Sequence, residues 1–261
     1  MPHLDRAGIS LYYEITGDAG GQPPLLLSHG YGASSRMWQP NLAALAADRQ
    51  VITWDMRGHG RSDSPDDPGQ YSHAACVADM AALLDAAGAE RAVVAGLSLG
   101  GFLSLEFVQQ YPQRTDAVML FDTGPGYRSD QARQQWNERA YATAERLDRD
   151  GIAALGGSAE ADFGHRSSHG LALAARGMLA QRDGRVIGAL PSVQVPVLVL
   201  VGARDQAFLG AADYLTAKIP GAVQVVIPDA GHMSNADQPQ LFDQAVLEFL
   251  RRRNALRLGT A

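Results

Sequence analysis

The amino-acid sequence predicts an α/β protein with a mostly parallel, doubly wound sheet and a helical insertion. Several short runs are almost continuously apolar, which is typical of strands buried on both faces. These runs are residues 25–27, 51–54, 92–95, 117–121 and 197–201. Helical patterns separate them, and strands that alternate with helices form a parallel sheet covered on both sides. The 261 residues, of which 46% are hydrophobic, are enough to bury one large core.

Hydrophobic spacing predicts the remaining elements in chain order. Residues 9–16 alternate apolar and polar side chains, as expected for a strand with one buried face, and this strand ends at the glycine-rich turn 17–21. A late strand is expected at residues 223–227. Helices are predicted at residues 35–47, 74–87, 99–111 and 240–252.

The segment 124–190 interrupts this alternation. It is polar and helix-prone, contains no strand pattern, and has a long amphipathic helix at 128–149. We expect it to form a helical cap, or lid, above the edge of the sheet where the loops gather, with residues 1–123 and 191–261 as the core. The sequence leaves open whether the large apolar residues of the cap line a pocket or pack its helices together. These residues are Trp136, Tyr141, Phe163 and Met178.

Composition and charge exclude several classes of function. The net charge of -6 gives no basic surface for a nucleic acid, and the basic run 251–253 completes an amphipathic helix. Cys76 is the only cysteine, which excludes an intrachain disulfide and a cysteine-based zinc cluster and favours a reducing compartment. No apolar run has the length of a signal peptide or a membrane span, so we expect a cytoplasmic protein without membrane contact. The oligomeric state stays open.

The pentapeptide Gly96-Leu97-Ser98-Leu99-Gly100 directly follows a predicted strand and precedes a predicted helix. A turn this sharp forces the central residue into a strained backbone conformation and brings its neighbours close to other elements unless they lack a Cβ. The same turn exposes the Ser98 hydroxyl near a helix N-terminus, where free N–H groups favour negative charge. Ser98 is therefore predicted to be a nucleophile.

Four motifs in a fixed order carry a resemblance to a known family. They are Ser-His-Gly-Tyr-Gly at 28–32, Asp-Met-Arg-Gly-His-Gly-Arg-Ser at 55–62, the turn around Ser98, and the late Gly231-His232. In this order the sequence resembles the α/β-hydrolase superfamily over nearly the whole chain apart from the insertion. The resemblance implies the α/β-hydrolase fold and a serine hydrolase. Residues 55–62 are expected to be a buried, internally hydrogen-bonded loop rather than a reactive one.

A serine nucleophile needs a base and a carboxylate that orients the base. Of seven histidines, only His232 follows a late strand and comes after Ser98, as the superfamily's chain order requires. Two carboxylates follow the carboxyl ends of strands, where a sheet presents its functional loops. Asp205 matches the usual superfamily position for the acid and is favoured. Asp122 matches a less common position and is the alternative, with loop capping as its expected role.

The resemblance also implies an oxyanion hole made from two backbone N–H groups. One belongs to Leu99, which follows the nucleophile, and the other belongs to Tyr31 in the loop after an early strand. Only main-chain groups are implied, which leaves the Tyr31 side chain free to line the pocket. His29 is expected to brace this loop rather than to react.

No cofactor or metal is predicted. His165 and His169 are four residues apart with Asp162 nearby, but Gly164 argues against a firm helix, and no further ligands stand at a suggestive spacing. A histidine of the cap that lies near the pocket is the favoured interpretation. The glycine-rich stretches contain neither of the two common nucleotide-binding patterns.

The sequence therefore predicts hydrolysis of a small-molecule ester or lactone through an acyl-serine intermediate. The resemblance is closest to small bacterial carboxylesterases and to the enol-lactonase group, whose Gly-His-x-Ser-Asn pattern resembles residues 231–235. A serine nucleophile argues against the haloalkane dehalogenases and epoxide hydrolases of this fold, which use aspartate. Perhydrolase or haloperoxidase-like chemistry and carbon–carbon bond hydrolysis use the same three residues and stay open. A non-catalytic small-molecule binding protein is the alternative from another class.

Overall fold

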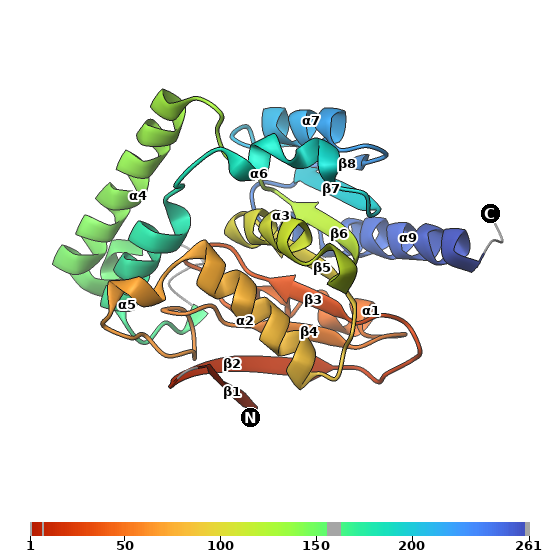
Figure 1. The fold of residues 1–261 in the computed structure, drawn as a ribbon, viewed down its shortest axis with the longest axis horizontal. Helices are drawn as coiled ribbons and strands as arrows, with labels where there is room; N and C mark the ends of the chain where they lie inside the picture. The colour runs from red at the N-terminus through yellow and green to blue at the C-terminus, as the bar shows by residue number, and fades with distance from the viewer. Residues whose placement is uncertain (1, 7, 156–162, 259–261) are drawn as a thin grey trace.

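The computed structural model describes residues 2–6, 8–155 and 163–258, and these build a single twisted sheet with helices on both faces (Figure 1). The eight strands follow the order β1-β2-β4-β3-β5-β6-β7-β8 across the sheet. Their bounds are β1 His3–Arg6, β2 Ile9–Thr16, β3 Leu25–Ser28, β4 Val51–Trp54, β5 Ala92–Leu97, β6 Thr115–Phe121, β7 Val197–Gly202 and β8 Val223–Ile227.

The strands from β3 to β8 are parallel, and only β1 and β2 run antiparallel to their neighbours. Every residue of β3, β4, β5, β6 and β7 is buried, which explains their continuous apolar runs. The predicted fold class is confirmed. Strand β1 was missed because its sequence, His-Leu-Asp-Arg, has little strand signal and pairs only with β2 at the edge.

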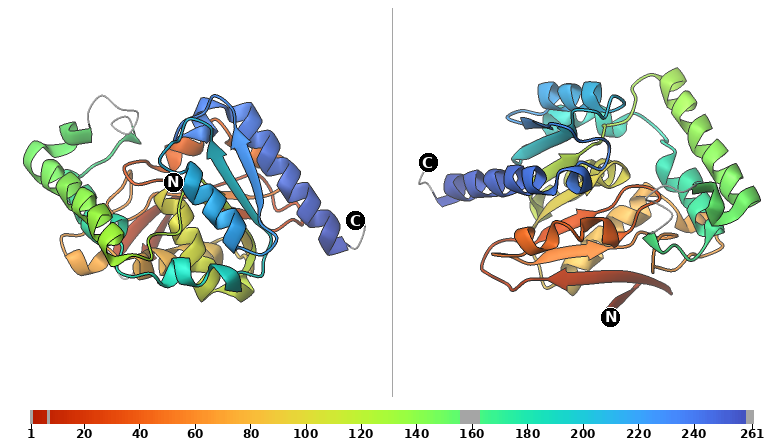
Figure 2. Two further views of the ribbon diagram at one scale, coloured as in Figure 1. Left: turned by 90° about the horizontal axis from the view of Figure 1, so that it is seen from above. Right: turned by 180° about the vertical axis from the view of Figure 1, so that it is seen from behind.

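Helices cover the two faces of the sheet in separate layers (Figures 1 and 2). One face carries α2 (His73–Ala86), α3 (Leu99–Gln110) and α7 (Leu209–Lys218), and the other carries α1 (Leu42–Leu45) and α9 (Pro239–Leu258). The remaining short helices of this core are η1 Ser35–Trp38, η2 Pro68–Gln70, η3 Pro112–Arg114 and α8 Ser234–Asp237. Among the described residues, no helix is long and apolar enough to cross a membrane.

The single helix predicted at residues 35–47 is wrong. The structure has the 3-10 turn η1 and the short helix α1, separated by Gln39, Pro40 and Asn41. Proline lacks the N–H that a continuing helix needs, so the helical hydrogen bonds are interrupted at Pro40. The helical spacing of apolar residues therefore runs across Pro40, although the helix itself is interrupted there.

The first part of the segment between β6 and β7 stands apart from the sheet, while Val186, Ile187 and Leu190 in its last part pack into the core (Figure 1). Its long helix α4 (Asp130–Asp150) confirms the predicted amphipathic helix, and Ser129 caps it by accepting from the N–H of Ala132. Its other described elements are η4 Gly151–Leu155, α5 Ser168–Ala174, the π-helical turn η6 Ala175–Leu179, α6 Arg185–Gly188 and η7 Leu190–Ser192. Residues 156–162 lie outside the described part. A small apolar cluster joins α4 to α5 and η6 through Ala144, Leu147 and Leu171.

The junction of β5 and α3 is packed so closely that side chains are excluded at its glycines. A Cβ on Gly96 would fall on the backbone of Gly100, and one on Gly100 would fall on the carbonyls of Ser28 and His29. A Cβ on Gly101 would reach the side chain of Thr123 at 2.5 Å. These close approaches hold β3, β5 and α3 together, and they explain why the pentapeptide needs its glycines.

Replacing Gly100 by alanine tests this close packing. The new methyl group would meet main-chain atoms of β3, which cannot move aside as a flexible side chain could. We expect Gly100→Ala to lower the free energy of unfolding by about 3 kcal/mol. Urea unfolding followed by circular dichroism measures the difference. Gly188→Ala is the control, since nothing lies within 4 Å of the added Cβ. Equal stability of the two variants would contradict the packing argument.

Candidate active site

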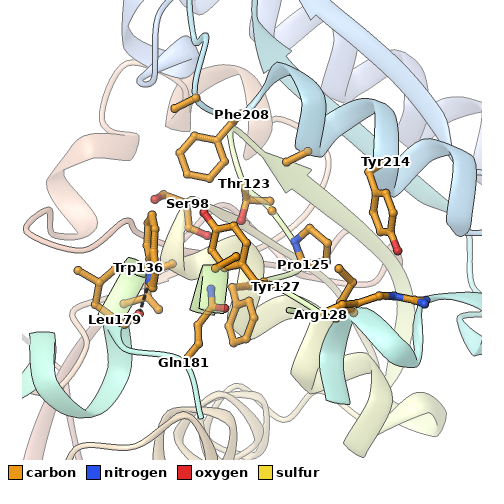
Figure 3. Close-up of a pocket in the computed structure, with 18 of the residues that line it drawn as sticks. Ser98, Thr123, Pro125, Tyr127, Arg128, Trp136, Leu179, Gln181, Phe208 and Tyr214 are labelled. Carbon is orange, nitrogen blue, oxygen red and sulfur yellow. Dashed lines mark hydrogen bonds between the residues drawn. The ribbon is translucent and has the colours of Figure 1, made fainter. Parts of the chain in front are cut away.

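Ser98 lies between β5 and α3 with φ 54° and ψ -115°. A non-glycine residue in this region is strained, and hydrogen bonds on both sides of the peptide hold it there. The Ser98 N–H donates to the carbonyl of Phe121 at 2.9 Å, and the Ser98 carbonyl accepts from Thr123 Oγ1 at 2.6 Å. Phe121 ends β6 and Thr123 follows it, so this segment holds both the N–H and the carbonyl of Ser98. The turn presents Ser98 to a cavity (Figure 3).

His232 and Asp205 come together from two different loops. The carboxylate of Asp205 follows β7 and accepts from Nδ1 of His232 at 2.7 Å. Because a carboxylate only accepts, Nδ1 carries the proton and Nε2 keeps its lone pair. The Asp205 side chain is 5% exposed and that of His232 is 42% exposed, so the carboxylate is buried while the imidazole ring reaches solvent. The Phe208 ring stacks on the imidazole with centroids 4.9 Å apart.

Asp122 lies close to this pair but serves other partners. Its fully buried carboxylate accepts from the N–H of Gly202 at 2.8 Å and from the hydroxyl of Ser234. Burial raises the pKa of Asp122 to about 7, although the two hydrogen bonds oppose the shift. Asp122, the alternative acid, thus caps the N–H of Gly202 at the end of β7. Asp205, the favoured acid, is the carboxylate that contacts His232.

The loop after β3 carries Tyr31, and Leu99 is the first residue of α3. His29 braces this loop, as expected: its Nδ1–H donates to the carbonyl of Gly30 at 2.7 Å, and its Nε2 accepts from the N–H of Met56 at 2.9 Å. The Tyr31 side chain points to the inserted segment, where its hydroxyl donates to the carbonyl of Leu171 at 2.9 Å. The Tyr31 side chain is therefore not among the walls of the cavity.

A cavity of about 440 Å³ lies between Ser98 and the inserted segment (Figure 3). Most of its lining is apolar, and the inserted segment supplies much of it, including Pro125, Tyr127, Ala132, Trp136, Met178, Leu179 and Ile187. Phe102 and Leu99 of α3 and Phe208 complete the apolar wall. Of the four large cap residues left open by the sequence, Trp136 and Met178 line the cavity, Phe163 packs into the core and Tyr141 is exposed.

The sequence matches the family model of the alpha/beta hydrolase fold over residues 23–176. The chain belongs to the α/β hydrolase fold family. The resemblance found in its four motifs is thereby confirmed.

Relatives and solved structures agree over nearly the full length of the chain. The chain is 30% identical to 3-oxoadipate enol-lactonase 2 of Acinetobacter baylyi, covering 96% of this chain and 97% of the relative. A crystal structure of an enol-lactonase from Burkholderia xenovorans LB400 has 28% identity and a TM-score of 0.78, covering 96% of this chain and all of that one. A thermophilic esterase from Thermogutta terrifontis has 29% identity and a TM-score of 0.83, covering 97% and 99%.

In this α/β hydrolase the loop 55–62 is a buried scaffold, as expected. The carboxylate of Asp55 accepts from the N–H of Ser35 at 2.7 Å and from the N–H of Arg61 at 2.8 Å. His165 does not line the cavity itself and is buried between two backbone loops. His169 is exposed beside Asp148, and Asp162 lies outside the described residues. Within the described ranges, no three His, Cys, Asp or Glu side chains gather as a metal site.

Several site residues of this α/β hydrolase were missed from the sequence. His73 begins α2 and lines the cavity while its Nε2 meets the carbonyl of Met178 at 2.5 Å. Gln181 also lines the cavity, and its buried Oε1 has no hydrogen-bond partner in the part of the chain that the structure describes. Phe208 stacks on His232, and Ser234 binds Asp122. Ser234 lies in the pattern at residues 231–235, which could have marked it, whereas no local motif marks His73, Phe208 or Gln181, which the fold brings to the site.

The raised pKa of Asp122 predicts a stability that depends on pH. The folded carboxyl keeps its proton up to about pH 7, whereas the unfolded one loses it near its ordinary value of 3.8. The folded state binds more protons in this window, so stability falls as pH rises through it. Asp122→Asn removes the charge, and we expect it to stabilise the protein at pH 8 by up to about 4 kcal/mol, with the gain fading towards pH 4.

Urea unfolding at pH 4.5, 6 and 8 measures this difference. The exposed Asp18 provides the control, since Asp18→Asn should follow the wild-type pH dependence. An Asp122→Asn variant that is less stable than the wild type at pH 8 would show that Asp122 is held as a charged group.

Proposed function

We propose that the protein hydrolyses carboxylic esters or lactones of small molecules through an acyl intermediate on Ser98. One observation carries the proposal: a serine in a strained strand-to-helix turn faces an apolar cavity, while the Asp205–His232 hydrogen bond of 2.7 Å lies beside the same cavity. Phe208 links the two, because it lines the cavity and stacks on His232. Nucleophile, base and orienting acid are the three groups that acyl transfer requires.

In the proposed mechanism His232 Nε2 takes the Ser98 proton as the Oγ attacks the substrate carbonyl carbon. The carbonyl oxygen becomes an oxyanion. When the carbonyl forms again, the C–O bond to the leaving group breaks, and His232 gives the proton to the oxygen of the leaving group. A water molecule then repeats the sequence, releasing the acid and restoring Ser98. For a lactone the leaving oxygen stays on the same molecule, so one open-chain hydroxy or keto acid results. Asp205 holds the ring and stabilises the imidazolium.

The oxyanion is held by the main-chain N–H groups of Tyr31 and Leu99. Leu99 opens α3, a helix of 12 residues, so the first-turn N–H groups and the helix dipole add positive potential there. The N–H groups are parts of two packed backbone segments, and fixed dipoles of this kind cost no reorganisation during the reaction. The three side chains and two N–H groups need no metal or organic cofactor.

The inserted segment 124–190 acts as the cap that selects the substrate. The cavity lies within the size range of small-molecule sites, and its largely apolar lining favours an aliphatic or aromatic acyl or leaving group. The enol-lactonase and esterase activities named for the relatives agree with an oxygen ester, open or cyclic. Ester and lactone hydrolysis use the same residues, and the shape of the cavity decides between them.

Substitution of the three proposed catalytic residues tests the mechanism. Ser98→Ala should reduce hydrolysis of p-nitrophenyl esters and of a lactone panel to background and abolish labelling by a fluorophosphonate. Asp205→Asn should lower kcat by about 10⁴-fold, because Nδ1 no longer meets a carboxylate. Asp122→Asn is the matched control and should retain most of the activity, since its carboxylate binds Gly202 and Ser234.

Three outcomes would contradict this mechanism. Ester hydrolysis by Ser98→Ala at the wild-type rate would exclude an acyl-Ser98 intermediate. If kcat fell more in Asp122→Asn than in Asp205→Asn, Asp122 and not Asp205 would be the acid that orients His232. A folded protein that hydrolyses none of the panel, escapes the fluorophosphonate and binds the substrates tightly would be a binding protein on this fold.

Filling the cavity from the cap tests its part in specificity. Ala132 of α4 lines the cavity, and a phenylalanine there would occupy space that a long acyl chain needs. We expect Ala132→Phe to keep activity on p-nitrophenyl acetate and to lower kcat/KM on the octanoate by about tenfold or more. Ala142→Phe, at an exposed position of the same helix, should leave the chain-length profile unchanged. An unchanged profile in Ala132→Phe would place the acyl group elsewhere.

A further inference from the structure

The inserted segment is hydrogen-bonded to the loop after β3 at three successive points. The Tyr31 hydroxyl donates to the carbonyl of Leu171 at 2.9 Å, and Ser34 Oγ donates to the carbonyl of Phe163 at 3.1 Å. Between them, the carbonyl of Gly32 accepts from Nε2 of His165 at 2.7 Å. Gly32 directly follows Tyr31 and has a φ of 75°, so this carbonyl belongs to a sharply turned part of the loop.

His165 also bonds to a second loop through its other ring nitrogen. The N–H of Gly60 donates to His165 Nδ1 at 3.0 Å. A backbone N–H can donate only to a lone pair, so Nδ1 is unprotonated and the ring proton is on Nε2. That proton meets the carbonyl of Gly32. A neutral imidazole with this one tautomer satisfies both backbone groups, and a charged ring would lose the bond to Gly60.

The surroundings of His165 keep the ring in that state and position. Its side chain is buried, and burial lowers its pKa, which favours the neutral form. The His59 ring packs against it with centroids 5.8 Å apart in an edge-on arrangement. Nearby, a Cβ on Gly58 would lie 2.5 Å from the carbonyl of Gly170, so the two backbones are in close contact. The segment from Phe163 to Leu171 is therefore docked on the core through fixed main-chain contacts.

We propose that His165 is a positioning residue for the oxyanion hole, because by bridging Gly32 and Gly60 it fixes the Gly32–Ala33 peptide, which lies just after Tyr31 in the same turned loop. This inference rests on the proposed function, in which the Tyr31 N–H holds the oxyanion. The ring touches neither the substrate cavity nor Ser98 and acts through the loop. Rotation of the Gly32 carbonyl away from His165 would turn the adjoining backbone and move the Tyr31 N–H off the position where negative charge develops.

Three substitutions separate the two hydrogen bonds. Glutamine offers an amide oxygen and an amide N–H at about the spacing of the two ring nitrogens, so His165→Gln can retain both bonds. His165→Asn can accept from Gly60 but is too short to donate to Gly32. His165→Leu fills the space and makes neither bond. His169→Leu is the matched control, because His169 is exposed in the same segment and pairs with Asp148.

The readouts are kcat, KM and the inhibition constant of an alkyl boronic acid, which forms a tetrahedral anion on a serine. We expect kcat to fall by about 10- to 100-fold in His165→Leu and His165→Asn, with KM nearly unchanged. Boronate affinity should fall in parallel with kcat, because both depend on the oxyanion donors. His165→Gln and His169→Leu should stay within about threefold of the wild type.

Wild-type kcat in His165→Asn and His165→Leu would overturn the inference, and so would an equal loss of kcat in His165→Gln. A loss that falls on KM with unchanged boronate affinity would assign His165 to the cavity instead. If His165→Leu does not fold, the comparison of Asn with Gln decides, since these two differ in the bond to Gly32. The proposed function fails separately, through an active Ser98→Ala variant.

Discussion

The close approach of three backbone segments around Ser98 determines the rest of the site. Strands β3 and β5 and helix α3 meet at distances that leave no room for a Cβ at Gly96 or Gly100. This contact forces Ser98 into the left-handed region and aims its side chain at the cavity, while hydrogen bonds to Phe121 and Thr123 hold the strained peptide. It also brings the end of β3 and the residue after it against the first turn of α3, close in sequence to Tyr31 and Leu99, the residues that carry the two proposed oxyanion donors.

Two carboxylates near His232 differ in environment more than in position. Asp205 is buried at the carboxyl end of β7 with its oxygen on an imidazole that reaches solvent. Asp122 is buried without access to solvent and serves Gly202 and Ser234, so its pKa rises to about 7. A group that is half protonated near neutrality would orient a base poorly, whereas Asp205 has a single strong donor to fix its role.

Local patterns in the sequence were sufficient to predict the parallel sheet, the long helix α4 and the loops that carry Ser98, Asp205 and His232. Buried strands and amphipathic helices leave characteristic apolar spacings in the sequence, because each spacing reflects which side chains of the element are buried. Pro40 broke an apolar period that looked helical, and β1 had too little strand signal to stand out. His73 and Gln181 reach the cavity only through long-range packing, which no spacing along the chain can reveal.

Two parts of the inserted segment, residues 125–136 and residues 163–171, make different kinds of contact. Several residues between 125 and 136 line the cavity, and on the proposed function their apolar side chains can vary with the substrate. Trp136 is more constrained, because its indole N–H donates to the carbonyl of Leu179 at 2.8 Å. Residues 163–171 instead meet the core through main-chain carbonyls and the ring of His165, which must match fixed partners on Tyr31, Gly32 and Gly60. In the proposed mechanism, one part of the segment therefore sets the specificity while the other part keeps the loop after β3, and with it the proposed Tyr31 oxyanion donor, in place.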